Sequence, residues 1–149
     1  MTMDGSMLLD RRRFLVVVAG AAATAACAGG NSSAVQFGDV NAGNVKDVVA
    51  GTLQLVGTEP VVLGRDSGGL YALTITCTHQ GCDVEPSGSG AAATLYCPCH
   101  GSQFDRNGGV LRGPANTPLG HFAVSVDAAG TITIHGGTQV DASTRTAVV

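Results

Sequence analysis

The sequence predicts a small all-β domain over residues 37–137, a sandwich or partly closed barrel of antiparallel strands. Charged residues make up 13% of the 149-residue chain, and 22 residues are glycine. This composition is wrong for a helical bundle and suits a loop-rich β domain. No segment after residue 37 keeps a helical period over three turns, whereas several alternate apolar and polar residues as strands do.

Short alternating runs define the expected strands, which cover residues 53–55, 61–63, 71–75, 122–126 and 132–134. Turn sequences lie at 66–69, at Asn107-Gly108 and at 127–130. Between residues 77 and 118 the alternation is weak, so the irregular loops of the domain are expected there.

Residues 1–27 are expected to be an export signal that precedes the fold. The pair Arg11-Arg12 resembles the twin-arginine pattern and is followed by an uncharged apolar run to about residue 26. That run is short for a membrane-spanning helix, which needs about 20 apolar residues. A flexible tether is expected over 28–36 and a C-terminal tail over 138–149.

Cys27 closes the apolar run, and three fates remain open for this segment. Ala25-Ala26-Cys27 resembles the end of a lipoprotein processing box, although Thr24 stands where such boxes usually have Leu. The other fates are ordinary cleavage near the alanines and an uncleaved anchor. Cys27 is also the one cysteine of five that lies outside the motifs described below, which makes it the lipidation candidate.

The net charge of −3 and the absence of a basic patch argue against a nucleic-acid partner. No repeat with a period of 20–50 residues is visible.

Two short clusters carry the candidate chemistry: Cys77-Thr78-His79-Gln80-Gly81-Cys82 and Cys97-Pro98-Cys99-His100-Gly101-Ser102-Gln103-Phe104. They spell C-x-H, a gap of 17 residues, and C-x-x-H, and each cluster adds one further cysteine. In this joint pattern the chain resembles Rieske proteins, from about Phe37 to His135. The resemblance implies a Rieske-type β domain with two cluster-binding loops.

By this resemblance, one 2Fe–2S cluster is held by Cys77 and Cys97 on the inner iron and by His79 and His100 on the outer iron. Two neutral imidazoles in place of two thiolates leave less negative charge on one iron. The reduced state is then easier to reach, and the potential rises to about −150 to +300 mV.

The resemblance also implies a disulfide between Cys82 and Cys99. Such a pair is typical of Rieske proteins of quinol-oxidising cytochrome complexes and of some periplasmic oxidases, and it is usually missing from aromatic-ring dioxygenases. A persistent disulfide requires an oxidising compartment, in agreement with the expected export signal.

Residues around the cluster are assigned by the same resemblance. Ser102 matches a serine whose hydroxyl bonds a cluster sulfide, and Pro114 lies in a loop that covers the cluster. Phe104 stands where quinol-oxidising members usually have Tyr, and Gln80 where respiratory members often have Leu. These two departures weaken assignment to a standard quinol-oxidising complex.

The main alternative for two cysteines and two histidines is a structural zinc site, although such sites usually use C-x-x-C knuckles. His121 and His135 alternate with Phe122 and Ile134, so both are expected on solvated strand faces. Arg106 is expected to be a turn or surface charge.

The sequence thus predicts an electron-transfer protein at the periplasmic face of a membrane, attached by its N-terminal anchor. Its donor would be quinol or the catalytic subunit of a periplasmic oxidase, and its acceptor a cytochrome or a copper protein. No nucleophile–base pair or substrate pocket is evident, so the chain is not expected to be an enzyme alone. An exported module with zinc or no metal is the alternative from another class, and a ferredoxin that feeds a dioxygenase is a third.

Overall fold

A computed structural model of the chain describes residues 35–148. The expected signal segment 1–27, with Cys27, and most of the tether 28–36 lie outside these residues. Across residues 35–148, the structure contains no helix with the length and apolar character that crossing a bilayer requires. The described part is built from strands and two short 3-10 helices, which confirms the all-β prediction.

The elements in chain order are β1 (Asp39–Asn44), η1 (Val45–Asp47), β2 (Leu53–Leu55), β3 (Val61–Asp66), β4 (Gly69–Thr74), β5 (Glu85–Ser87), η2 (Gly90–Ala92), β6 (Thr94–Tyr96), β7 (Gln103–Asp105), β8 (Val110–Arg112), β9 (His121–Val126) and β10 (Thr131–Val140).

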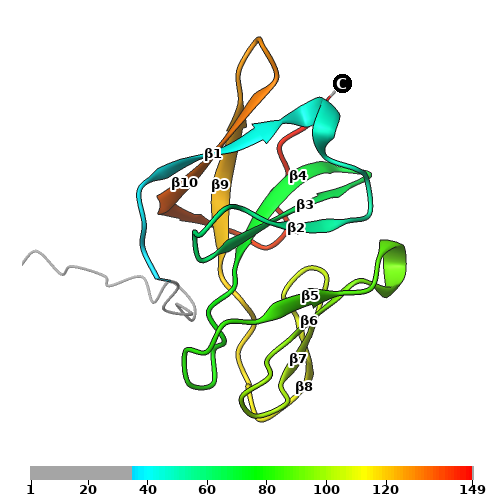
Figure 1. Cartoon of the computed structure of the whole chain (residues 1–149), viewed down its shortest axis with the longest axis vertical. Helices are drawn as coiled ribbons and strands as arrows, with labels where there is room; N and C mark the ends of the chain where they lie inside the picture. The colour runs from blue at the N-terminus through cyan, green and yellow to red at the C-terminus, as the bar shows by residue number, and fades with distance from the viewer. Residues whose placement is uncertain (1–34, 149) are drawn as a thin grey trace, which may run out of the picture.

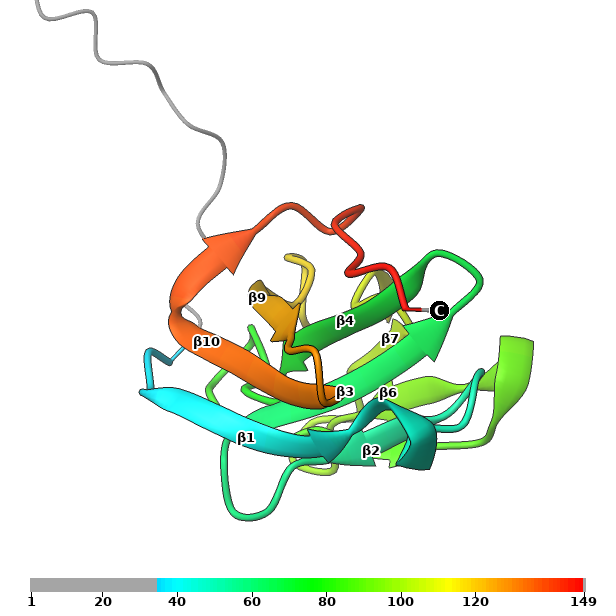
Figure 2. The same cartoon turned by 90° about the horizontal axis from the view of Figure 1, so that it is seen from above.

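Six antiparallel strands form the larger sheet, in the order β1-β10-β9-β4-β3-β2. Its strands turn progressively, so the sheet curls around its core as half of a barrel (Figure 2). Strand β4 and the first four residues of β3 are buried on both faces. Because successive side chains point to opposite faces, Val61 and Leu63 enter one core with Phe122, while Val62 enters the other.

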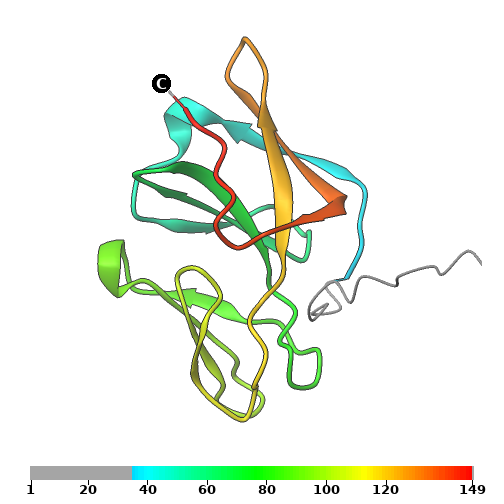
Figure 3. The same cartoon turned by 180° about the vertical axis from the view of Figure 1, so that it is seen from behind.

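The smaller sheet, β5-β6-β7-β8, is inserted between β4 and β9 (Figures 1 and 3). Each of its four strands is three residues long and pairs only with neighbours inside the insertion. Leu95 of β6 and Phe104 of β7 share a buried core with Tyr71 and Leu73 of β4. The insertion therefore depends on the larger sheet for the core that holds it in place.

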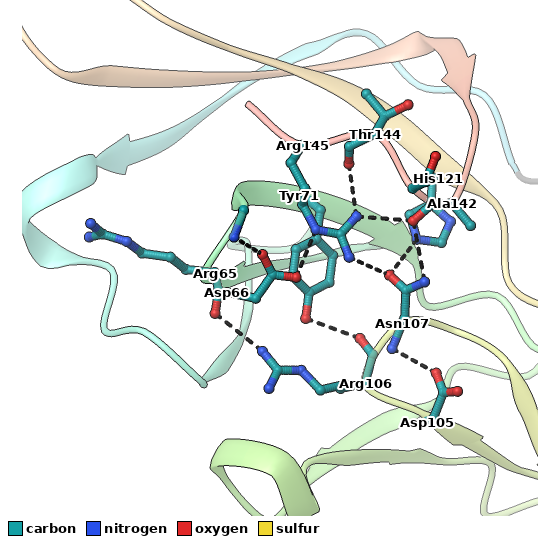
Figure 4. Close-up of polar contacts among 12 residues, drawn as sticks. Arg65, Asp66, Tyr71, Asp105, Arg106, Asn107, His121, Ala142, Thr144 and Arg145 are labelled. Carbon is teal, nitrogen blue, oxygen red and sulfur yellow. Dashed lines mark hydrogen bonds and ion pairs between the residues drawn. The ribbon is translucent and has the colours of Figure 1, made fainter. Parts of the chain in front are cut away.

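The C-terminal segment links the two sheets through the side chain of Arg145 (Figure 4). The Arg145 guanidinium donates to the Asp66 carboxylate at 2.8 Å and to Asn107 Oδ1 at 2.7 Å. It also stacks over the Tyr71 ring, 4.1 Å from its centroid. Thr146 pairs with Leu70, and β10 itself runs three residues past the expected domain boundary at residue 137.

Arg106 also joins the sheets, although a turn or surface charge was expected. Its guanidinium donates to the carbonyls of Gly90 and Arg65, each at 3.3 Å. Its own carbonyl accepts a hydrogen bond from the Tyr71 hydroxyl at 3.2 Å. The side chain thus links β3 of the larger sheet to η2, which lies between β5 and β6 of the smaller sheet.

His121 is buried, which corrects the prediction of a solvated residue: its exposed fraction is 3%. Strand alternation correctly placed His121 on the face of β9 opposite Phe122, but the turn at Asn107 covers the face on which His121 lies. His121 Nε2 lies 3.4 Å from Asn107 Oδ1. Burial, followed by the positive charge of Arg145, lowers the pKa of His121 to about 4.

His135 remains partly exposed and connects three strands. Its Nδ1 lies 2.9 Å from Asp39 Oδ2 on β1, and its Nε2 lies 2.8 Å from Ser125 Oγ on β9. This order of groups is that of a serine–histidine–aspartate triad, which the sequence did not indicate. Because the Asp39 side chain is 64% exposed, water reaches the chain of hydrogen bonds, and we interpret it as a cross-strand link.

We predict that His121 makes the folded protein sensitive to acid. The unfolded chain protonates this residue below its ordinary pKa of about 6.5, whereas the folded protein keeps it neutral down to about 4. The free energy of unfolding should therefore fall by about 2.5 kcal/mol between pH 6.5 and pH 4 because of this residue alone. Urea unfolding across this range measures the effect.

His121→Gln should remove that part of the pH dependence, while the carboxylates keep theirs. Gln139→Ala, an exposed substitution in β10 that removes no titratable group, serves as the control and should retain the dependence of the parent. Equal slopes for the parent and His121→Gln would contradict the prediction.

Candidate iron–sulfur centre

Two loops at the end of the molecule remote from β1 carry the predicted ligands, one between β4 and β5 and one between β6 and β7 (Figure 1). Both loops use the same backbone hydrogen bonds. In the first, the Cys77 N–H donates to the Cys82 carbonyl at 2.8 Å and the Gly81 N–H to the Cys77 carbonyl at 2.9 Å. Gly81 has φ = 77°, a conformation that glycine adopts without strain.

The second loop repeats this arrangement. The Cys97 N–H donates to the Ser102 carbonyl at 2.8 Å, and the Gly101 N–H to the Cys97 carbonyl at 3.0 Å. Gly101 has φ = 79°. Each loop therefore begins at a buried cysteine and carries its histidine within a tight turn, as the C-x-H and C-x-x-H spacings require.

A disulfide between Cys82 and Cys99 joins the two loops, with an S–S distance of 2.09 Å, and confirms the expected pairing. Cys77 and Cys97 are buried and carry free thiols. Burial, followed by the hydrogen bond with Cys77, raises the pKa of the Cys97 thiol. The raised pKa of Cys97 favours its protonated thiol unless a cation replaces the proton.

The predicted histidines face each other across the loops. The ring centroids of His79 and His100 lie 4.8 Å apart, with an angle of 85° between the ring planes. His79 Nδ1 is buried and has no hydrogen-bond partner. A buried nitrogen without a partner is unfavourable unless a ligand such as a metal occupies it.

The four predicted ligands therefore fit an iron–sulfur cluster in donor chemistry: two buried thiols and two imidazoles, supplied in equal parts by two cross-linked loops. The sulfur atoms of Cys82, Cys97 and Cys99 also lie within 4.8 Å of one another. Cys82 and Cys99 are joined in the disulfide, so this second grouping offers one free thiol and does not make a metal site.

A third segment, 113–117, packs against both loops. The Ala115 N–H donates to Ser102 Oγ at 3.0 Å, and Ser102 is fully buried. The Thr78 hydroxyl donates to the Thr117 carbonyl at 2.6 Å. Sequence reasoning missed Thr78 and Thr117, because the contact joins residues 39 positions apart and neither position carries a local signal.

The other residues expected around the cluster differ in their exposure to solvent. Gln80, within the turn of the first loop, and Pro114 are exposed. Phe104 is fully buried in the core that also contains Cys77 and Cys97. Phe104 therefore presents an apolar ring where a tyrosine would add a hydroxyl.

Residues 38–123 match the Rieske [2Fe-2S] domain, which is well over half of the chain. The chain therefore belongs to the Rieske family, whose domain carries one 2Fe–2S cluster. Membership of this family favours an iron–sulfur cluster over zinc at the site.

Individual relatives agree with this assignment. The cytochrome b6-f complex iron-sulfur subunit of Synechococcus sp. (strain CC9605) is 49% identical over 67 residues, which is 45% of this chain and 36% of that protein. The cyanobacterial plasma membrane Rieske protein PetC3 from Synechocystis PCC 6803 has a TM-score of 0.51 and 33% identity, over 64% of this chain and 97% of the other.

A second structural likeness is to a complex of reduced oxygenase and oxidized ferredoxin in carbazole 1,9a-dioxygenase. The TM-score is 0.52 and the identity 28%, over 69% of this chain and 97% of the matched chain. Each structural match covers nearly the whole of the other chain, whereas this chain spans about a third of the length of the cytochrome b6-f subunit.

We predict that Ser102 holds the segment 113–117 against the second loop. Ser102→Ala leaves the buried Ala115 N–H without its acceptor, which costs about 1–3 kcal/mol. Amide hydrogen exchange at Ala115 should accelerate by about tenfold or more, since 1.4 kcal/mol corresponds to a factor of ten. Ser87→Ala, in an exposed position of β5, is the control and should leave that rate unchanged. An unaltered rate in Ser102→Ala would contradict this role.

Proposed function

We propose that this chain transfers single electrons through its cluster as the iron–sulfur component of a quinol-oxidising cytochrome complex. The observation that carries the proposal is the pair of disulfide-linked loops, each with one buried thiol and one histidine. The similarity to cytochrome b6-f iron-sulfur subunits supports a complex of this kind.

In this proposal Cys77 and Cys97 bind the inner iron, and His79 and His100 bind the outer iron. The cluster, when bound, accepts and releases one electron at a time. The burial of both cysteines excludes water from the inner side of the site. His100 is exposed, so it brings the edge of the site to the surface where a redox partner docks.

Ser102 and Phe104 set the potential in opposite directions. Ser102 Oγ accepts the Ala115 N–H, which leaves its own proton available for donation to a cluster sulfide. Phe104 offers no donor, so the electron-rich reduced state lacks one stabilising hydrogen bond. The potential should therefore lie below that of relatives with a tyrosine at this position and remain within the range of histidine-ligated clusters.

The chain would act at the periplasmic face of a membrane, after export by the segment 1–27 and attachment through Cys27 or an uncleaved anchor. A plasma membrane Rieske protein among the similar structures supports a membrane location. Quinol, or the catalytic subunit of a periplasmic oxidase, would be the donor, and a cytochrome or a copper protein the acceptor.

A ferredoxin that feeds a dioxygenase is the second candidate, because of the likeness to the carbazole dioxygenase complex. The disulfide between Cys82 and Cys99 disfavours it, since dioxygenase Rieske domains usually lack this pair.

The first test is the content of the site in purified full-length protein. We expect about two irons and two sulfides per chain, and a visible absorption spectrum that zinc cannot produce. In His100→Cys a thiolate replaces an imidazole, so any cluster retained should have a lower reduction potential. His135→Cys is the control and should keep the parent potential. One zinc without sulfide would refute the cluster, and an unchanged potential in His100→Cys would refute that ligand.

The second test concerns Phe104. Phe104→Tyr supplies a hydroxyl toward a cluster cysteine, and the hydrogen bond strengthens as the sulfurs gain negative charge on reduction. A difference of about 1 kcal/mol corresponds to about 40 mV for one electron, so the potential should rise by about that amount. Phe122→Tyr, which adds a hydroxyl in the other core, should leave the potential unchanged. Equal potentials in the parent and Phe104→Tyr would contradict this account of tuning.

A further inference from the structure

A free thiol lies beside the disulfide of the cluster site. The sulfur atoms of Cys82, Cys97 and Cys99 are all within 4.8 Å of one another. Cys77, the other free cysteine of the described residues, does not belong to this mutually close group. Thiols attack disulfides through a mixed disulfide, so closeness to a sulfur of the bond is the first requirement, and Cys97 meets it for both sulfurs.

We propose that Cys97, besides serving as an iron ligand, is a latent nucleophile for the Cys82–Cys99 disulfide. Once iron is removed, Cys97 attacks Cys82 Sγ, which produces a Cys82–Cys97 disulfide and a free Cys99. Ligation to iron prevents this exchange because it occupies the Cys97 sulfur. The protection rests on the proposed function of Cys97 as a ligand, whereas the exchange itself rests on the positions of the three sulfurs.

The exchange balances without an external oxidant or reductant. Cys97 gives up its thiol proton to the solvent and forms a bond to Cys82 Sγ. The bond between Cys82 and Cys99 breaks, and Cys99 leaves as a thiolate that takes up a proton. One disulfide is replaced by another, and the number of free thiols does not change.

Burial determines which sulfur leaves. Cys99 is exposed, so water stabilises the negative charge that develops on its sulfur, whereas Cys82 is half-buried. Attack on Cys82 with departure of Cys99 is therefore favoured over attack on Cys99. The buried position of Cys97 disfavours its charged form, so the exchange should take minutes to hours, as uncatalysed disulfide rearrangements do.

This exchange has a consequence for assembly. The product holds Cys97 in a disulfide, so one of the two thiolates that would bind the inner iron is no longer available. The cluster cannot then be rebuilt. Cluster insertion must then precede disulfide formation, or follow it before the exchange proceeds. Loss of the cluster in an oxidising compartment becomes irreversible unless a reductant reopens the new disulfide.

Differential alkylation of the full-length protein tests the proposal. Iron is removed by anaerobic chelation, and samples are taken over several hours. Free thiols are labelled with light iodoacetamide, disulfides are then reduced, and the released thiols are labelled with heavy iodoacetamide. Tandem mass spectrometry assigns light or heavy label to each cysteine, including Cys97 and Cys99 within one peptide.

At the start, light label should lie on Cys77 and Cys97. With time it should move from Cys97 to Cys99, while Cys77 stays light and Cys82 stays heavy. Cys77→Ser should exchange at the parent rate, and Cys97→Ser should keep Cys99 heavy throughout. This pair of variants also distinguishes exchange in the folded protein from exchange in an unfolded chain, where Cys77, five residues from Cys82, would react as well.

Retention of light label on Cys97 in the chelated parent would overturn the proposal, as would light Cys99 in Cys97→Ser. The cluster-loaded protein should show no light Cys99 over the same period. If loaded and chelated protein exchange at equal rates, Cys97 is not a ligand and the ligand assignment fails, while the exchange itself stands. The exchanged protein should regain visible absorption with iron and sulfide after treatment with dithiothreitol and not before.

Discussion

The covalent link between Cys82 and Cys99 is the constraint on which the site depends. Each ligand loop is held internally by two backbone hydrogen bonds. Because these bonds lie within one loop, they do not fix its position relative to the other loop. The disulfide closes a segment of 17 residues, which is worth about 3 kcal/mol in the chain-entropy model. The two histidine rings lie edge to face across the linked loops, so donors from two separate loops meet at one place.

Packing connects this site to the rest of the molecule. The strands of the smaller sheet are three residues long and could not form a stable sheet without a covering core. β3 and β4 supply that core on one face while they complete the core of the curled sheet on the other. The Arg145 guanidinium and the Tyr71 hydroxyl extend the connection with polar contacts, so the C-terminal segment contributes to the position of the site.

The two cysteines and the two histidines of the site differ in their exposure to water. Water is kept from the thiols of Cys77 and Cys97, while His100 is exposed, and our proposal places electron exchange with a partner at that surface. The closeness of Cys97 to the disulfide follows from the same loop geometry that brings the ligands together. In our proposal the iron therefore has two effects, since it carries the electron and keeps Cys97 from the neighbouring disulfide.

The sequence by itself determined the features that depend on local spacing. Alternation predicted the all-β class and the strands at 61–63 and 122–126. The two short motifs carried the resemblance to Rieske proteins, and that resemblance implied the four ligand candidates and the pairing of Cys82 with Cys99. The tertiary structure alone decided the burial of His121, the Thr78–Thr117 and Ser102–Ala115 contacts and the role of Arg145. These features join residues that are remote in the sequence, and a hydrogen bond or a covered strand face across such a distance leaves no periodic pattern in the chain. Alternation shows which way a side chain points, and the fold decides what covers it.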